Sequence, residues 1–126
     1  MRRDRRPVFL NLLQIKLPVP GLVSIAHRVS GVLLFLALPV ILLMLTRAIR
    51  DESGYQSVHQ LLSSPLGILI VAPLVWSFWH HLLSGIRFLL LELDIGYEQQ
   101  AAVRSAKFTL VLGLVLTLIS VIWWYS

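Results

Sequence analysis

Three long stretches without a formal charge constrain this chain more than any other feature of its sequence. They cover residues 29–46, 60–86 and 108–126, which are 18, 27 and 19 residues long, and only two histidines interrupt the second. About 20 apolar residues cross a bilayer as an α-helix, so each stretch is long enough to span a membrane. We therefore predict an all-α membrane protein with three transmembrane helices, at approximately residues 21–48, 61–87 and 106–125.

The composition agrees with a chain that is dissolved largely in lipid. Hydrophobic residues make up 57% of the 126 residues and charged residues 13%, against about 45–50% and about 25% in a soluble domain. A soluble domain this small cannot hide so much apolar surface, because small domains bury proportionally less of it. The connections are too short for a further domain, so we expect residues 1–126 to form a single membrane anchor with short surface helices at most between its spans. Such a chain is not catalytic alone.

The positions of lysine and arginine predict how the spans are oriented. Nine basic residues fall on the side of the N-terminus: Arg2, Arg3, Arg5, Arg6, Lys16, Arg28, Arg87, Arg104 and Lys107. Only Arg47 and Arg50 fall on the other side. Because cytoplasmic loops carry the excess of basic residues, we expect a cytoplasmic N-terminus and a periplasmic C-terminus in a bacterial inner membrane. The charge is not arranged as a basic, aromatic-studded face, so no nucleic-acid partner is expected.

A first polar cluster at membrane depth consists of Ser24, His27, Arg28 and Gly31. Offsets of three, four and seven residues place them along one face of a helix. Ionisable residues at this depth are costly and mark functional sites by default. Arg28 has the chemistry to bind a carboxylate, a carbonyl or a phosphate; the alternative is an anchor that reaches the lipid headgroups. The presence of Ser24 and His27 beside it favours a ligand site.

A second cluster begins with two adjacent histidines, His80 and His81, and the latter shares a predicted helix face with Ser84, Gly85 and Phe88. Small residues beside an imidazole let a flat macrocycle approach, and neutral imidazole is a common haem-iron ligand. Such a cofactor would place its iron at His81 and its carboxylates toward the arginines. The alternative is a histidine hydrogen-bonded to a neighbouring helix. Consecutive residues point about 100° apart on a helix, so the two histidines do not bind one iron together.

Two motifs resemble the cytochrome b membrane-anchor subunit of bacterial succinate dehydrogenase, the succinate:quinone oxidoreductase of complex II. The first is Ser24-Ile25-Ala26-His27-Arg28-Val29-Ser30-Gly31, and the second is His81-x-x-x-Gly85-Ile86-Arg87, followed by an acidic residue at Glu92. Shorter matches extend the resemblance over nearly the whole chain; they are Arg6-Pro7-Val8, Leu17-Pro18 and Arg104-Ser105-Ala106-Lys107.

The resemblance implies roles for four residues. His81 corresponds to an axial ligand of a b-type haem, whose other axial histidine comes from a second small membrane subunit. Ser24 and Arg28 correspond to residues that line the ubiquinone pocket, and His27 and Arg28 to residues near the haem propionates. The resemblance also implies a heteromeric helical bundle on whose cytoplasmic face an iron–sulfur subunit and a flavoprotein subunit dock. Electrons from succinate oxidation in the tricarboxylic acid cycle would pass through this assembly to ubiquinone.

The chain departs from the family pattern at three positions. Many relatives have a histidine directly after the Gly-Ile-Arg triplet, where this chain has Phe88. The later acidic residue is often aspartate and is Glu92 here, and His80 is a rival ligand one position before His81. The spacing to Gly85 favours His81.

Three other functions stay open at the level of sequence. A fumarate reductase anchor has the same architecture and runs in the opposite physiological direction. A purely structural anchor would bind neither haem nor quinone. A channel or transporter subunit needs a continuous polar path, and the third apolar stretch is poor in polar groups, with Thr109, Thr117 and Ser120 before its end.

Overall fold

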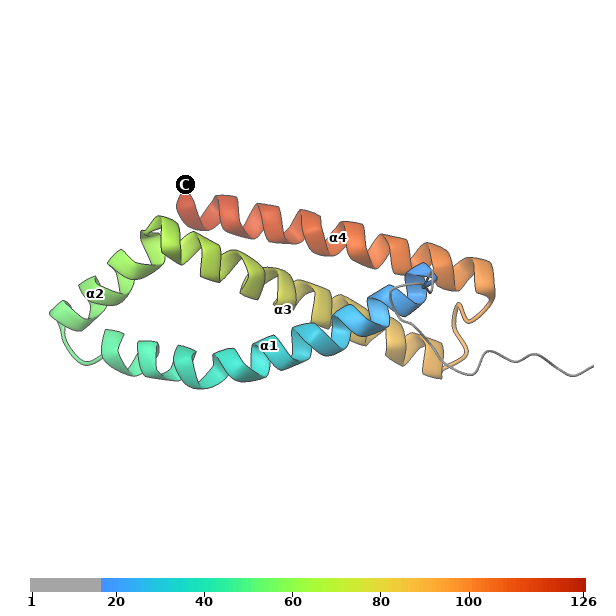
Figure 1. Cartoon of the computed structure of the whole chain (residues 1–126), viewed down its shortest axis with the longest axis horizontal. Coiled ribbons are helices and arrows are strands. Elements are labelled where there is room, and N and C mark those ends of the chain that lie inside the picture. The colour runs from blue at the N-terminus through green and yellow to red at the C-terminus, as the bar shows by residue number, and fades with distance from the viewer. Residues whose placement is uncertain (1–16) are drawn as a thin grey trace, which may run out of the picture.

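A computed structural model describes residues 17–126, which form four helices (Figure 1). They are α1 (Val19–Ala48), α2 (Glu52–Ser63), α3 (Pro65–Glu92) and α4 (Gln99–Tyr125). By length and composition α1, α3 and α4 are candidate membrane spans, which confirms the predicted all-α fold with three spans. The basic residues Arg2, Arg3, Arg5, Arg6 and Lys16, and the Arg6-Pro7-Val8 match, lie outside the described residues, and the orientation of the termini stays a prediction.

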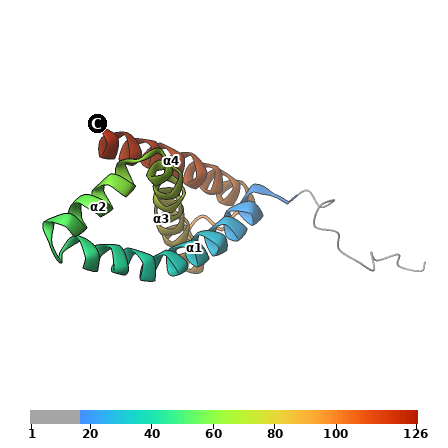
Figure 2. The ribbon, with the colours of Figure 1, turned by 60° about the vertical axis from the view of Figure 1, so that its left-hand side comes forward.

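The central helix of the bundle is α3, which packs against α1 on one side and against α4 on the other (Figures 1 and 2). The start of α1, the end of α3 and the start of α4 lie at one end of the bundle, which we term the loop end. The short helix α2 and the C-terminus lie at the other end, termed the α2 end. Toward the α2 end α1 diverges from α3, and α2 connects the two (Figure 2).

Capping residues explain why α2 and α3 are separate helices. Asp51 precedes α2, and its carboxylate accepts a hydrogen bond of 2.6 Å from the backbone N–H of Gly54. Ser64 precedes α3 and caps it in the same way, and Pro65 follows at the first helical position, where its missing N–H removes no hydrogen bond. The expected second span at residues 61–87 therefore overlaps two helices, with the boundary at Ser64.

The long helices extend beyond the apolar stretches at the loop end. Only residues 93–98 separate α3 from α4, and two of them, Asp94 and Gly96, have positive φ angles of 58° and 74°. Residues 99–105, placed before the expected third span, form the first turns of α4. Short surface helices at most were expected in the connections, and within residues 17–126 the first connection contains α2 whereas the second is a tight loop.

Inside the bundle the side chains are small or polar, and outside it they are apolar. The buried apolar side chains are few, namely Val23, Ala37 and Ala106, and the buried polar ones are Ser30, Ser77, His80, Ser84, Arg87, Thr109 and Thr117. Large apolar side chains face outward instead; Phe35 is 75% exposed and Trp123 78%. Small residues let helices approach closely inside a membrane, where burial from water does not drive association. The outer surface is therefore suited to lipid or to other membrane helices.

Side-chain hydrogen bonds join α4 to the rest of the bundle along its length. They are Arg87 Nε to Ser105 Oγ at 3.0 Å, Trp79 Nε1 to Ser120 Oγ at 3.0 Å, and the Tyr125 hydroxyl to the Leu62 carbonyl oxygen at 2.7 Å. The first lies at the loop end and joins α4 to α3, whereas the last lies at the α2 end and joins α4 to α2, so α4 is held near both of its ends.

Candidate functional site

The imidazole of His81 lies against α1 and is held there by two oxygen atoms. Its Nδ1 is 3.0 Å from the carbonyl oxygen of His27 and 3.3 Å from the Oγ of Ser30. A carbonyl oxygen only accepts, so Nδ1 donates its proton and the lone pair of the neutral ring is on Nε2. No group within residues 17–126 hydrogen-bonds this Nε2. The side chain therefore presents a metal-ligand nitrogen whose partner is not supplied by the described part of the chain.

A second imidazole, that of His27, stacks on the ring of His81. The two ring centroids are 4.1 Å apart and the planes are inclined by 7°. Phe88 packs edge-on against His27 with a centroid distance of 5.2 Å. The structure thus brings together His27 from the first predicted cluster and His81 and Phe88 from the second.

Two glycines make this close approach of α1 and α3 possible. A Cβ atom at Gly31 would be 2.8 Å from Cε1 of His81, closer than Cβ atoms normally come, so a larger residue here would displace the His81 ring or the helix. A Cβ atom at Gly85 would be 3.6 Å from Nε2 of His27, which is an ordinary van der Waals contact. The space around the His81 ring is therefore set mainly by Gly31.

The neighbouring histidine, His80, is completely buried, and its ring lies near the backbone of Val23 on α1. Its ring stacks on Trp76 with a centroid distance of 4.9 Å, and its Nε2 is 3.3 Å from the Oγ of Ser84. Its backbone lies against Gly113 of α4. A flat macrocycle has no open approach to this ring. Ser84 was predicted to share a helix face with His81, and in the structure its hydroxyl lies near His80.

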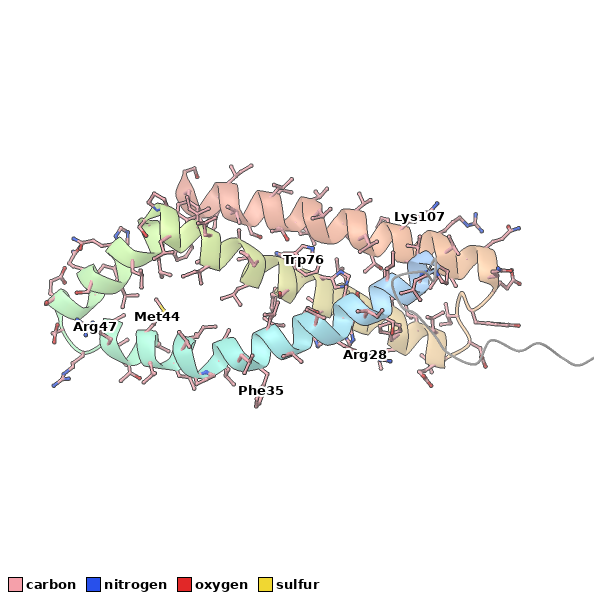
Figure 3. All side chains as sticks on the ribbon, in the orientation of Figure 1. Arg28, Phe35, Met44, Arg47, Trp76 and Lys107 are labelled. Carbon is pink, nitrogen blue, oxygen red and sulfur yellow. The ribbon has the colours of Figure 1, made fainter. Side chains whose placement is uncertain are left out.

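On α1, Ser24 and Arg28 are one turn apart, with Ser24 half-buried and Arg28 exposed. Figure 3 shows Arg28 on the edge of α1 that faces away from α4. Neither side chain hydrogen-bonds to another group within residues 17–126. The residues of the first predicted cluster therefore have different surroundings. His27 contacts α3, while Arg28 remains at the outer surface. Within residues 17–126, the hydrogen-bonding groups of Ser24 and Arg28 are thus not engaged by another side chain or by the backbone.

Arg87, which belongs to the second motif, has different surroundings from His81. Its side chain is only 6% exposed, and it donates to the Oγ of Ser105 and to the carbonyl oxygen of Ala102, both at 3.0 Å. Both partners belong to α4, whereas His81 faces α1. The expectation that cofactor carboxylates point toward the arginines therefore does not extend to Arg87, since its guanidinium is engaged by α4.

Sequence reasoning assigned no role to Ser30, although the structure places its Oγ beside the His81 ring. A signal was present, because Ser30 follows His27 by three residues and so lies on the same side of α1. The pairing of Arg87 with Ser105 had no such local signal, since 18 positions separate the two residues. Within residues 17–126 there is no group of three His, Cys, Asp or Glu side chains that is arranged to hold a metal ion.

Fold and site together define a helical membrane protein with three candidate spans and with an imidazole pair and an exposed arginine at one end. The sequence places this protein more closely. Residues 2–120 match the succinate dehydrogenase/fumarate reductase transmembrane subunit family, and the chain belongs to that family.

Three curated relatives are similar to the chain over nearly their whole length. The relative from Paracoccus denitrificans is 27% identical over 122 residues, which cover 97% of this chain and 94% of the relative. The relative from Coxiella burnetii is 31% identical over 120 residues, with coverages of 94% and 96%. The relative from Rickettsia felis is 27% identical over 116 residues, with coverages of 92% and 90%. Each is named succinate dehydrogenase cytochrome b556 subunit.

These findings confirm the resemblance and the assignment as a membrane anchor of the succinate dehydrogenase type. Family membership implies a complex with other subunits. Together with the three candidate spans, it agrees with a multi-pass location in a bacterial inner membrane.

Proposed function

We propose that this membrane anchor binds b-type haem through His81 and reduces ubiquinone at Ser24 and Arg28. The observation that carries the haem assignment is the contact between Nδ1 of His81 and the carbonyl oxygen of His27. A histidine that binds a metal almost always donates its other ring N–H to a carbonyl, a carboxylate or water, which fixes the tautomer and the ring orientation. His81 has this arrangement, and its Nε2 is the nitrogen left for iron.

The residues around His81 fit a flat cofactor better than those around His80. The His81 ring lies at the surface of the α1–α3 contact and is half-buried, whereas the His80 ring is enclosed and already near Ser84. When bound, the haem supplies a one-electron carrier. The chain contributes the ligand nitrogen, its fixed tautomer and the stacked ring of His27, which is available with Arg28 for the propionates.

Ubiquinone reduction requires two electrons and two protons, and negative charge develops on the quinone oxygens as electrons arrive. A hydroxyl donor at Ser24 and a cationic donor at Arg28 would stabilise that charge in surroundings of low dielectric constant. Because Arg28 is exposed and unpaired within residues 17–126, its guanidinium is free to bind a quinone oxygen. Protons reach this site from the water at the same end of the bundle.

The proposed assembly needs a second iron ligand and a source of electrons, which we assign to partner subunits. One imidazole supplies one axial position, so we propose that a second small membrane subunit supplies the other and shares the haem. The exposed apolar surface of α1, which includes Phe35, suits a neighbouring helix. An iron–sulfur subunit and a flavoprotein subunit would deliver electrons from succinate. The names of the three relatives favour succinate oxidation over the fumarate reductase direction.

The haem assignment is tested by reduced-minus-oxidised visible spectra of the purified complex. We expect the wild type and His80→Leu to show a b-type haem signal and His81→Leu to lose it, because the His81 side chain is half-buried and its Nε2 is unbonded within residues 17–126, whereas His80 is completely enclosed. Co-purification of the partner subunits controls for assembly in all three samples. Loss of the signal in His80→Leu with retention in His81→Leu would reverse the assignment, and an assembled wild-type complex without haem would refute it.

The quinone assignment is tested with Arg28→Leu. Removing one preorganised donor from a site of developing negative charge costs about 10²–10³ in turnover, so we expect succinate:quinone activity to fall by about 10²-fold. Succinate oxidation by an artificial dye should be unchanged, since it bypasses the anchor. Arg47→Leu is the matched control, because Arg47 is an exposed arginine on the same helix at the α2 end. Equal loss of both activities would indicate a failure of assembly instead of quinone binding.

A further inference from the structure

We propose that Ser30 is a positioning residue for the iron ligand, acting through the Nδ1 atom of His81. This inference rests on the proposed role of His81. Neither the family nor the names of the relatives assign a function to Ser30. The proposal is that its hydroxyl, together with the carbonyl oxygen of His27, fixes the ring of His81 and increases the basicity of Nε2.

The geometry around Ser30 brings three polar groups into mutual contact. Its Oγ donates a hydrogen bond of 2.9 Å to the carbonyl oxygen of His27, one turn earlier on α1. The donated proton leaves the Oγ lone pairs free, and Oγ is 3.3 Å from Nδ1 of His81. The N–H of the imidazole therefore has two acceptors, the His27 carbonyl at 3.0 Å and the Ser30 hydroxyl. Two acceptors restrict ring rotation more than one does.

Burial strengthens the hydrogen bonds among Ser30, His27 and His81. Ser30 is completely buried between α1 and α3, so water does not replace its hydroxyl. Hydrogen bonds are electrostatically stronger in such surroundings than in water. An acceptor on Nδ1 pushes electron density into the ring and raises the basicity of the ligand nitrogen. A more basic nitrogen stabilises ferric iron more than ferrous iron, so the Ser30 hydroxyl should lower the reduction potential of the bound haem.

A simpler role for Ser30 is that of a small residue that lets two helices pack. Two other serines provide a comparison for this role. Ser77 and Ser84 are also completely buried on α3, but Ser84 contacts His80 and the Oγ of Ser77 has no hydrogen-bond partner within residues 17–126. If packing were the only function, truncation of Ser30 and of Ser84 should affect the haem equally.

The experiment uses the purified complex with Ser30→Ala and, as the matched control, Ser84→Ala. Two readouts are made: the midpoint potential of the haem, and its affinity from haem retention against an apo-protein scavenger. We expect Ser30→Ala to shift the potential in the positive direction and to lower haem affinity about 10-fold, the low end for loss of such a partner. Ser84→Ala should leave both values at those of the wild type. Ser30→Thr, which keeps the hydroxyl, should restore the wild-type potential.

The potential and haem affinity of these variants decide whether Ser30 positions the iron ligand. A potential in Ser30→Ala that is unchanged, shifted negatively, or shifted no more than in Ser84→Ala overturns the positioning role. If Ser30→Ala does not assemble, Ser30→Cys is measured instead, because it keeps a side chain of similar size with a much weaker acceptor, and the same positive shift is expected. His81→Leu separates this inference from the one on which it rests. If that variant keeps its haem, the ligand assignment fails; if it loses haem while Ser30→Ala behaves as the control, only the role of Ser30 fails.

Discussion

At the scale of single residues, the His81 ring is fixed from three directions by α1. The carbonyl of His27 and the hydroxyl of Ser30 contact Nδ1, the ring of His27 stacks on one face, and Gly31 lies against Cε1. Each contact depends on a different property, namely an acceptor atom, a flat ring and the absence of a side chain. We expect the site to be more sensitive to the residue type at these α1 positions than at exposed positions of the same helix.

Gly31→Ala tests the steric part of this arrangement. Its methyl group would meet Cε1 of His81 at 2.8 Å, and the ring cannot rotate away without losing the hydrogen bond to His27. Overpacking of this kind costs about 1–3 kcal/mol, so we expect lower haem occupancy in the purified complex, measured as the haem-to-protein ratio. Gly85→Ala is the control, because its methyl group meets His27 at an ordinary distance of 3.6 Å and should leave occupancy unchanged. Full occupancy in Gly31→Ala would show that α1 and α3 separate easily.

The sequence predicted part of this site correctly, and the reason lies in helix geometry. The rotation of about 100° per residue separates His80 from His81, and the structure indeed buries the first and leaves the second at the α1 contact. The same periodicity placed Ser84 on the face of His81, but it did not predict that the serine hydroxyl lies near His80. Periodicity predicts which side of a helix a residue occupies, but the partner of a short polar side chain depends on the neighbouring helix.

At the scale of elements, apolar stretches predicted the three long helices, while their ends depended on local chemistry. The pair Ser64-Pro65 begins α3, so residues 61–63 belong to α2. Hydropathy alone does not detect such a boundary, because α2 ends in apolar residues that continue into the apolar start of α3. At the loop end, charged residues such as Arg104 occur inside α4, since a helix continues into the interface where its charges reach water.

The contact between α3 and α4 is tested by Arg87→Leu. This change removes the hydrogen bonds from the guanidinium to Ser105 and to the carbonyl of Ala102. Inter-helix hydrogen bonds inside membranes are worth about 0.6 kcal/mol on average, so two of them should contribute about 1 kcal/mol. We expect a lower midpoint of thermal unfolding for the complex, with haem retained. Arg104→Leu, at an exposed position of α4, should have little effect. Loss of haem without loss of stability would instead link Arg87 to the cofactor.

At the scale of the whole molecule, this chain is incomplete on its own in two ways. Its large apolar side chains point outward, and within residues 17–126 its buried apolar side chains are only three. It also supplies one proposed iron ligand, His81, and the proposed assembly would take a second ligand from another subunit. A second set of membrane helices would cover the apolar surface and supply the other ligand. Haem binding and assembly should therefore stabilise one another by linkage. The sequence predicted this dependence through composition, since a chain of this size cannot enclose so much apolar surface.

The last prediction concerns the orientation of the whole molecule in the membrane. Arg28, Arg104 and Lys107 fall at the loop end, and this basic excess should keep the loop end in the cytoplasm. The chain contains no cysteine, so single-cysteine variants give an unambiguous label. We expect Ser53→Cys, exposed on α2, to react with a membrane-impermeant maleimide in intact cells. Gln100→Cys, exposed at the start of α4, should react only after permeabilisation.

Labelling of both variants in permeabilised cells shows that each cysteine is accessible, and co-purification of the partner subunits shows that each chain is assembled. The reverse pattern in intact cells would place the α2 end in the cytoplasm. In that case Ser24 and Arg28 would lie near the periplasmic surface, on the side opposite to the proposed succinate-oxidising subunits. Electrons would then have to cross most of the bilayer before reaching the quinone. The orientation measurement therefore tests the proposed position of quinone reduction as well as the distribution of charge.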